Sequence, residues 1–168
     1  MNWLKADPNR HVRDYLSYYL SLTSPPGYAV MIRGPWGIGK TFLIRKILAE
    51  LFDDEKAYIY VSLYGVDTPS EIDTAIFAAT HPILGSKAAK VVGRALNAGL
   101  KFNGIENPIT IQDFERRTTG AIYVFDDIER SSMSSDAIFG YINQFVEHSG
   151  CRVVLVANEA ELENSEGY

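Results

Sequence analysis

Cysteine is almost absent from this chain, since Cys151 is the single cysteine among 168 residues. No disulfide can therefore join two parts of the chain, and a reducing compartment suits it best. Uninterrupted apolar runs of about 18 residues are also lacking, so no segment is expected to span a bilayer. The first ten residues lack the apolar core of a secretory signal. We expect a cytoplasmic protein in which Cys151 acts as a small buried hydrophobic side chain.

A basic excess is missing as well, because 16 lysines and arginines face 21 acidic residues, for a net charge of −5. The chain as a whole thus carries no general signal for nucleic acid. Apolar residues are plentiful, at 46% of the chain against 22% charged. This composition is too apolar and too weakly charged for a disordered chain, and the length fits one domain.

Helix and strand patterns alternate along the chain. Four short apolar or β-branched runs predict strands at 28–33, 57–63, 121–126 and 152–157. Asp7-Pro8 predicts the start of a first helix, with Asp7 as its N-cap and Tyr15 on its apolar face. Later helices are predicted at 41–52, 70–80, 86–102, 111–118 and 135–148.

This alternation predicts an α/β fold of three layers with a mainly parallel sheet. We expect an N-terminal helix and linker over residues 1–27. The remainder, 28–168, is expected to form a core with a helical insertion at about 70–118.

The first predicted strand is joined to the next helix by G-x-x-x-x-G-K-T, in the strand–loop–helix context that this phosphate-binding motif requires. Glycines let the backbone close around an anion, so that successive N–H groups and a helix N-terminus point at phosphates. Lys40 is expected to reach the β and γ oxygens, and the Thr41 hydroxyl to bind Mg²⁺. The expected nucleotide contacts are Gly34, Pro35, Trp36, Gly37, Ile38, Gly39, Lys40, Thr41 and Phe42.

Acidic residues follow the third predicted strand, in the run Asp126-Asp127-Ile128-Glu129-Arg130. Parallel sheets bind ligands at the carboxyl ends of their strands, and in P-loop folds the first acid there holds Mg²⁺. Asp126 is therefore the candidate metal ligand. Asp127 is the candidate general base for an attacking water, with Glu129 as a competing candidate. Either of these two could instead cap the next helix or lie in solvent.

Asn158 comes one residue after the fourth predicted strand, at the same expected edge of the sheet. Its amide could contact the γ-phosphate or the attacking water, or it could simply end the strand. The candidate catalytic residues are thus Lys40, Asp127, Glu129 and Asn158, and the candidate metal ligands are Thr41 and Asp126.

These motifs resemble those of the additional-strand P-loop ATPases, and within them the KAP family and its STAND relatives. The similar segments are Gly34–Thr41 with its tryptophan, the acidic run Phe125–Arg130, and Val154–Asn158, which looks like the sensor-1 strand. The resemblance implies Mg-dependent ATP hydrolysis or ATP-gated switching. It also implies roles like those of relatives in bacterial antiviral defence, in signalling and in membrane-associated scaffolds.

The resemblance further implies a sheet in the order 5-1-4-3-2, of which this chain supplies strands in the order 1-4-3-2. Residues 159–168 carry four glutamates and no apolar run, so we expect the fifth strand to be missing or supplied elsewhere and the core to be truncated. The helical lid and its arginine sensor would be missing too, with Arg130 as the nearest substitute. Because an arginine finger is worth about 10³–10⁵ in rate, slow turnover is expected unless further domains or self-association complete the site.

The predicted helix at 86–102 departs from the KAP pattern. In that pattern, transmembrane helices often lie between the phosphate-binding motif and the acidic motif. Four cations lie on one of its faces and exclude a membrane span: Lys87, Lys90, Arg94 and Lys101. That face could contact nucleic acid, a membrane surface or an acidic partner, or it could be an ordinary solvated surface.

Two classes of function remain open. The first is an ATPase that binds Mg-ATP and hydrolyses it slowly. The second is a nucleotide-dependent switch or scaffold that binds ATP with little turnover. A GTPase is disfavoured because Asn158-Glu159 lacks the Asn-Lys-x-Asp signature, and the tandem acids favour a hydrolase over a small-molecule kinase.

Overall fold

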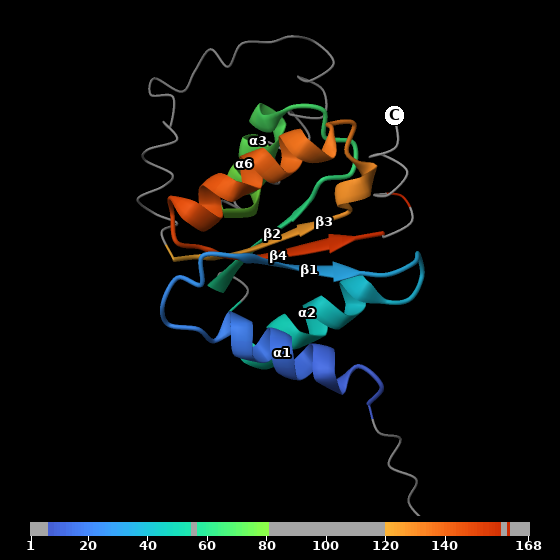
Figure 1. Ribbon diagram of the computed structural model, residues 1–168, viewed down its shortest axis with the longest axis vertical. Helices are drawn as coiled ribbons and strands as arrows, with labels where there is room; N and C mark the ends of the chain where they lie inside the picture. The colour runs from blue at the N-terminus through green and yellow to red at the C-terminus, as the bar shows by residue number, and fades with distance from the viewer. Residues whose placement is uncertain (1–6, 55–56, 81–119, 159–160, 162–168) are drawn as a thin grey trace, which may run out of the picture.

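Four parallel strands form the centre of the part of the chain that the structure describes (Figure 1). This computed structural model describes residues 7–54, 57–80, 120–158 and 161. The strands are β1 (Ala29–Arg33), β2 (Tyr58–Ser62), β3 (Ile122–Asp126) and β4 (Arg152–Ala157). They lie in the order β1-β4-β3-β2, and every neighbouring pair is parallel. The predicted α/β class, parallel sheet and order 1-4-3-2 are confirmed.

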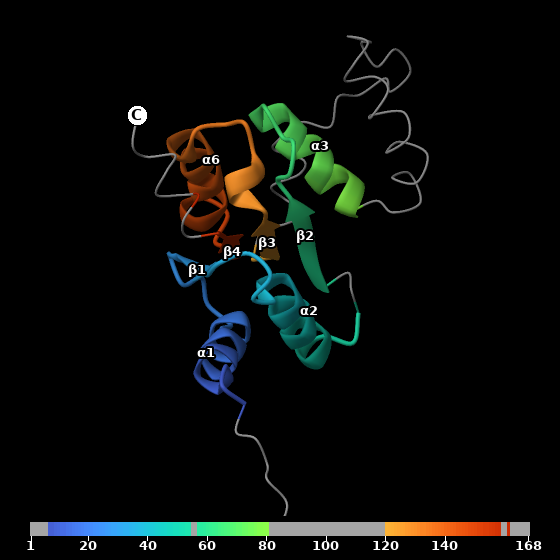
Figure 2. The same ribbon diagram turned by 90° about the vertical axis from the view of Figure 1, so that its right-hand side faces the viewer.

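Helices cover both faces of the sheet, as Figure 1 and Figure 2 show. On one face lie α1 (Arg10–Leu20) and α2 (Lys40–Leu51), and on the other lie α3 (Pro69–Thr80) and α6 (Ser135–Glu147). A short 3-10 helix, η2 (Ile128–Arg130), follows β3 directly. These are the three predicted layers. The helices predicted at 86–102 and 111–118 lie outside the described residues, as does most of the predicted insertion.

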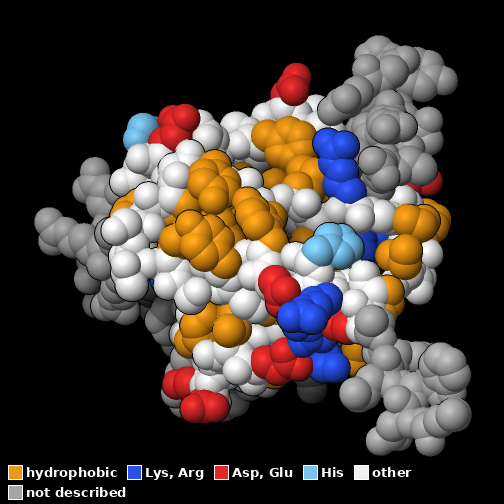
Figure 3. Space-filling model, turned by 60° about the horizontal axis from the view of Figure 1, so that its bottom comes forward, with side chains coloured by type: hydrophobic (Ala, Val, Ile, Leu, Met, Phe, Trp, Pro, Cys, Tyr) orange, Lys and Arg blue, Asp and Glu red, His pale blue; other side chains and the backbone are white. Residues whose placement is uncertain are grey.

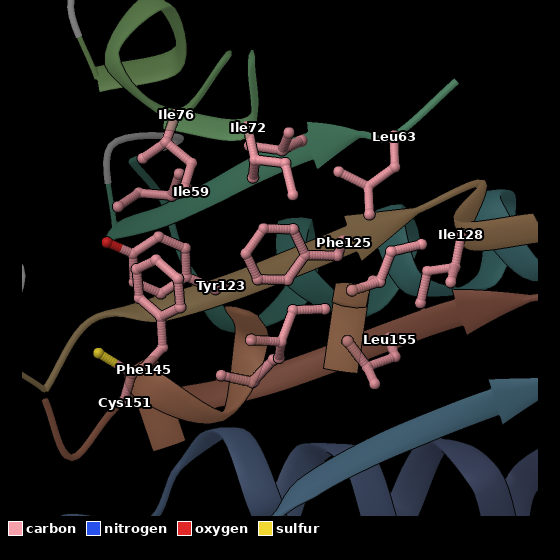
Figure 4. Packing of buried hydrophobic residues seen from close by; sticks show 14 of the residues in the cluster. Ile59, Leu63, Ile72, Ile76, Tyr123, Phe125, Ile128, Phe145, Cys151 and Leu155 are labelled. Carbon is pink, nitrogen blue, oxygen red and sulfur yellow. The ribbon is translucent and has the colours of Figure 1, made fainter. Parts of the chain in front are cut away.

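The interior strand β3 is an apolar run without alternation between polar and apolar residues. All five of its residues are buried, since helices cover both faces. Ile122 and Val124 pack toward α1 and α2, whereas Tyr123 and Phe125 pack toward α3 and α6. Figure 4 shows the second group, in which the Tyr123 and Phe125 rings stack with centroids 5.8 Å apart. Cys151 belongs to the same cluster and is fully buried, as predicted.

A tyrosine hydroxyl and an arginine join helix α1 to the sheet, and Arg152 of β4 donates to the Leu20 carbonyl at 2.6 Å. Tyr19 donates to the Tyr28 carbonyl at 2.8 Å and accepts the Val153 N–H at 2.9 Å. The predicted N-cap of this helix is wrong by two residues. The helix begins at Arg10 after Asn9, because the Asp7 carboxylate accepts the Asn9 N–H in a turn that precedes the helix.

The predicted inward position of Tyr15 is also wrong, since this side chain is 48% exposed. Leu16, Tyr19 and Leu20 already fill the contact between α1, α2 and the sheet, and all three are buried. Figure 3, which brings the underside of the molecule forward, shows that hydrophobic side chains remain on the surface there.

The carboxyl ends of the four strands lie at one end of the sheet, because every neighbouring pair is parallel. This is the position at which α/β sheets bind their ligands. β1 is an edge strand among the described residues, and 159–160 and 162–168 lie outside them, so the missing fifth strand stays a prediction. No described helix is both long and apolar enough to cross a membrane.

Candidate functional site

A glycine-rich loop connects the end of β1 to the first turn of α2. Gly39 is the N-cap of α2 and has a φ of +93°, and Gly37 has a φ of +75°. Only glycine adopts such angles without a steric cost, so the two glycines permit the turn into the helix. The first N–H groups of α2 have no partner within the helix, and together with its dipole they favour an anion at this loop.

Lys40 is the first residue of α2, and its side chain extends over the same loop. Its ammonium group donates to the carbonyl of Gly34 at 2.7 Å and to the carbonyl of Pro35 at 3.0 Å. The positive charges of Lys40 and of the helix N-terminus therefore coincide at the loop. Ile38, in the loop, and Phe42, in the first turn of α2, are two further expected contact residues. Their side chains are 65% and 73% exposed.

The acidic end of β3 meets the phosphate loop through one hydrogen bond. The Thr41 hydroxyl donates to Oδ2 of Asp126 at 2.8 Å. The Tyr60 hydroxyl, from β2, donates to the same oxygen, and the Asp127 N–H donates to Oδ1 at 2.9 Å. Asp126 is only 4% exposed, so its carboxylate is held by three donors in a buried position.

The Thr41 hydroxyl and the Asp126 carboxylate fit a magnesium site. Both supply hard oxygen atoms, and they lie in hydrogen-bond contact at the phosphate loop. Among the described residues, no group of three or more His, Cys, Asp or Glu side chains is arranged to hold a metal ion. Mg²⁺ does not need such a cage, because it is usually held by one or two carboxylates together with water and substrate phosphates.

Asp127 follows Asp126 in a sparsely populated backbone conformation. Its φ of +57° lies in the left-handed region, as for no other non-glycine residue that the structure describes. The Ser62 hydroxyl donates to its Oδ2 at 2.8 Å, and the Arg130 guanidinium lies 3.8 Å from its Oδ1. Aspartate tolerates this conformation, and such strain is often concentrated at functional sites.

Glu129 is joined to the phosphate loop by the indole of Trp36, which donates to Oε1 at 3.1 Å. Its other oxygen, Oε2, is buried and accepts no hydrogen bond from any described residue. Asn158 is 4% exposed, and its Oδ1 likewise lacks a partner within the described part of the chain. Two buried polar oxygens at this end of the sheet are thus available to a ligand or to water.

Several side chains at the site were not predicted from the sequence. They are Arg45 on α2, Tyr60 and Ser62 on β2, and Tyr64 two residues after β2. Ser62 is the residue paired with Asp126 in the β2–β3 register, so knowledge of this register could have indicated it. The sequence alone does not give the register.

Tyr60 is a weaker acid than an ordinary tyrosine. Burial raises its pKa, and the hydrogen bond to the neighbouring Asp126 carboxylate raises it further. The Arg45 guanidinium lies 4.5 Å from the centroid of the Tyr60 ring. Contact with Tyr60 in turn raises the pKa of Arg45. Tyr60 is therefore a neutral donor to Asp126 across the usual pH range.

Two curated proteins are similar in sequence to this chain. The chain is similar to heat shock protein 100 of Trypanosoma brucei brucei, with 28% identity over 112 residues. It is similar, with 28% identity over 113 residues, to the chaperone protein ClpB of Prochlorococcus marinus. Each aligned segment covers 67% of this chain but 11% of the relative, so the chain spans about a tenth of the length of these curated proteins.

A family model covers the phosphate loop and its surroundings more directly. Residues 9–103, more than half of the chain, match the model described as the KAP family P-loop domain. The match includes α1, β1, the glycine-rich loop and α2. The resemblance noted from the sequence motifs is thereby confirmed. This chain belongs to the KAP family of P-loop domains.

Proposed function

We propose that this domain binds ATP with Mg²⁺ at the Gly34–Thr41 loop and hydrolyses it slowly. The observation that carries the proposal is the 2.8 Å hydrogen bond between Thr41 and Asp126. It brings the phosphate-loop hydroxyl and a buried carboxylate from a separate strand to one point. A buried carboxylate must be hydrogen-bonded, and here one of its donors is the hydroxyl of the phosphate-binding motif.

The residues of the loop have distinct roles in this proposal. Lys40 exchanges its two carbonyl partners for the β- and γ-phosphate oxygens, and the backbone N–H groups before and within the first turn of α2 donate to the same phosphates. Thr41 and Asp126 hold Mg²⁺. When bound, that ion would offset the negative charge that develops during phosphoryl transfer.

Asp127 is the proposed general base, and Glu129 is the second candidate. Asp127 directly follows the proposed metal ligand, but its carboxylate is already shared between Ser62 and Arg130. Glu129 has one buried oxygen with no partner among the described residues, which favours a contact with water. Asn158, with its similarly unpartnered Oδ1, is proposed to orient the attacking water or the γ-phosphate.

The alternative is a switch that binds ATP with little turnover. A binding panel of ATP, ADP and GTP with and without Mg²⁺, followed by steady-state phosphate release on the same sample, separates the two. Mg-dependent ATP binding with slow phosphate release supports the ATPase. Binding without measurable release supports the switch. No binding of any nucleotide would contradict both.

A role as the ATPase module of a bacterial antiviral-defence or signalling protein is proposed on family resemblance. In such a system, self-association or further domains would complete the site. Measurement of the molecular mass with and without Mg-ATP tests self-association. Protection of bacteria from phage by the wild type, lost with Lys40→Ala, tests the defence role.

A further inference from the structure

Tyr60 and Arg45 lie next to the proposed metal ligand Asp126 and have no role in the proposed ATP hydrolysis. The Tyr60 hydroxyl donates to Oδ2 of Asp126, the same oxygen that accepts the Thr41 hydroxyl. The Arg45 guanidinium lies over the Tyr60 ring, 4.5 Å from its centroid. Thr41, Asp126, Tyr60 and Arg45 therefore form a continuous chain of contacts.

The secondary structure brings these four side chains together in pairs. Thr41 and Arg45 are four residues apart on α2, so they occupy one face of that helix a turn apart. Tyr60 pairs with Val124 in the β2–β3 register. Val124 is two residues before Asp126, so Tyr60 and Asp126 lie on the same face of the sheet. The two contacts thus occur where one face of α2 meets one face of the β2–β3 pair.

We propose that Tyr60 is a positioning residue for Mg²⁺ and that Arg45 acts through it. A hydroxyl that ligates a metal ion must turn its proton away from the ion, and the Thr41 hydroxyl does so by donating a hydrogen bond to Oδ2 of Asp126. The Tyr60 donor fixes that oxygen in place. Without it, the carboxylate of Asp126 keeps only the Thr41 hydroxyl and the Asp127 N–H as donors. Oδ2 is then held less firmly, and so is the direction of the Thr41 lone pairs. The inference rests on the proposed Mg-ATP site.

The size of the expected effect follows from the behaviour of other metal sites. Loss of a partner that orients a metal ligand typically lowers metal affinity about 10- to 100-fold. Tyr60→Phe removes only the hydroxyl and keeps the ring beneath Arg45. We therefore expect the Mg²⁺ concentration that half-saturates binding of a fluorescent ATP analogue to rise about tenfold. Affinity for the same analogue in EDTA should stay at the wild-type value.

Tyr58→Phe is the matched control for this experiment. Tyr58 is on the same strand and the same face, but it pairs with Ile122 at the other end of β3. The Tyr58→Phe variant should leave the Mg²⁺ dependence of analogue binding unchanged. Binding of Mn²⁺ to the protein–nucleotide complex, followed by electron paramagnetic resonance, gives a second measurement that does not depend on turnover. The same tenfold weakening is expected there for Tyr60→Phe alone.

Arg45 is tested by a double-mutant cycle. Arg45→Met should raise the half-saturating Mg²⁺ concentration about threefold in the wild type and not at all in Tyr60→Phe, because two residues that act in series are not additive. An additive effect would overturn the role of Arg45. Wild-type Mg²⁺ dependence in Tyr60→Phe, or equal loss of binding in EDTA, would overturn the role of Tyr60. A wild type that binds no nucleotide would instead refute the proposed function.

Discussion

The indole N–H of Trp36 donates to Oε1 of Glu129 at 3.1 Å, across 93 positions of sequence. This hydrogen bond joins the phosphate loop to the turn that follows β3. The Arg130 guanidinium, on the same turn, lies 5.4 Å from the centroid of the Trp36 ring and 5.3 Å from that of Tyr64. A ligand that moves the loop would therefore also move the acidic turn, and Trp36 would report it.

The first prediction is that Mg-ATP changes the fluorescence of Trp36. The chain has two tryptophans, Trp3 and Trp36, and only the second lies in the loop. Indole emission responds to a change in a hydrogen bond or in a stacked cation. Titration of Trp3→Phe with Mg-ATP should retain the change in emission, whereas Trp36→Phe should lose it. A change that survives in Trp36→Phe would show that the loop is not the source.

Lys40→Ala is expected to lower ATP affinity by about two orders of magnitude, because charge-assisted hydrogen bonds to phosphate are worth about 1.5–3 kcal/mol each. The fold should persist, since the Lys40 ammonium donates to the loop carbonyls of Gly34 and Pro35 and Lys40 is not a core residue. Calorimetric binding and thermal unfolding measure the two effects. Lys46→Ala, an exposed lysine on the same helix, is the control and should bind as the wild type does. Wild-type turnover by Lys40→Ala would refute the site.

Substitutions of Asp126, Asp127 and Glu129 are expected to affect different steps. Asp126→Ala should abolish the Mg²⁺ dependence of ATP binding. Asp127→Asn should bind ATP normally and slow its cleavage by about 100-fold or more, the range of a general base. Single-turnover phosphate release in Asp127→Asn and Glu129→Gln decides between the two candidate bases. A slow Glu129→Gln beside a normal Asp127→Asn would transfer the role to Glu129.

Gly39→Ala should destabilise the domain by about 1–2 kcal/mol, because an L-residue pays this cost in the left-handed region. The φ of Gly39 is +93°, although nothing lies within 4 Å of an added Cβ. Gly140 is the matched control, since it lies in α6 with equal free space and no positive φ. Gly140→Ala should stabilise the domain by about 0.5–1 kcal/mol. Urea unfolding compares the two, and equal effects would contradict the argument from φ.

The stability of the domain is expected to fall above pH 10 through Tyr19. Burial raises the pKa of Tyr19 to about 12. The folded state then keeps a proton that the unfolded state loses, so the stabilisation is present below pH 10 and lost as the pH rises toward 12. Two pH units correspond to about 3 kcal/mol. Unfolding free energies at pH 9, 10, 11 and 12 should fall less steeply in Tyr19→Phe than in the wild type.

Much of the fold followed from local patterns. The four strands were predicted to within a residue at each end, because each is a short apolar or β-branched run. The helix predicted at 135–148 is α6, and Ser134 caps it by accepting the Ala137 N–H at 3.3 Å. The start of α1 was predicted wrongly, because Asp7 can bind backbone N–H groups in a turn as well as in a cap.

The sequence by itself determined the phosphate loop, its link to a following helix, and the strand that ends in Asp126. These features depend on residues adjacent in the chain, and their spacing alone predicts their local structure. Only the tertiary structure decided that Tyr60 and Thr41 share one oxygen of Asp126, or that Trp36 contacts Glu129. Such contacts depend on strand register and on how α2 packs against the sheet, which are set by the whole core.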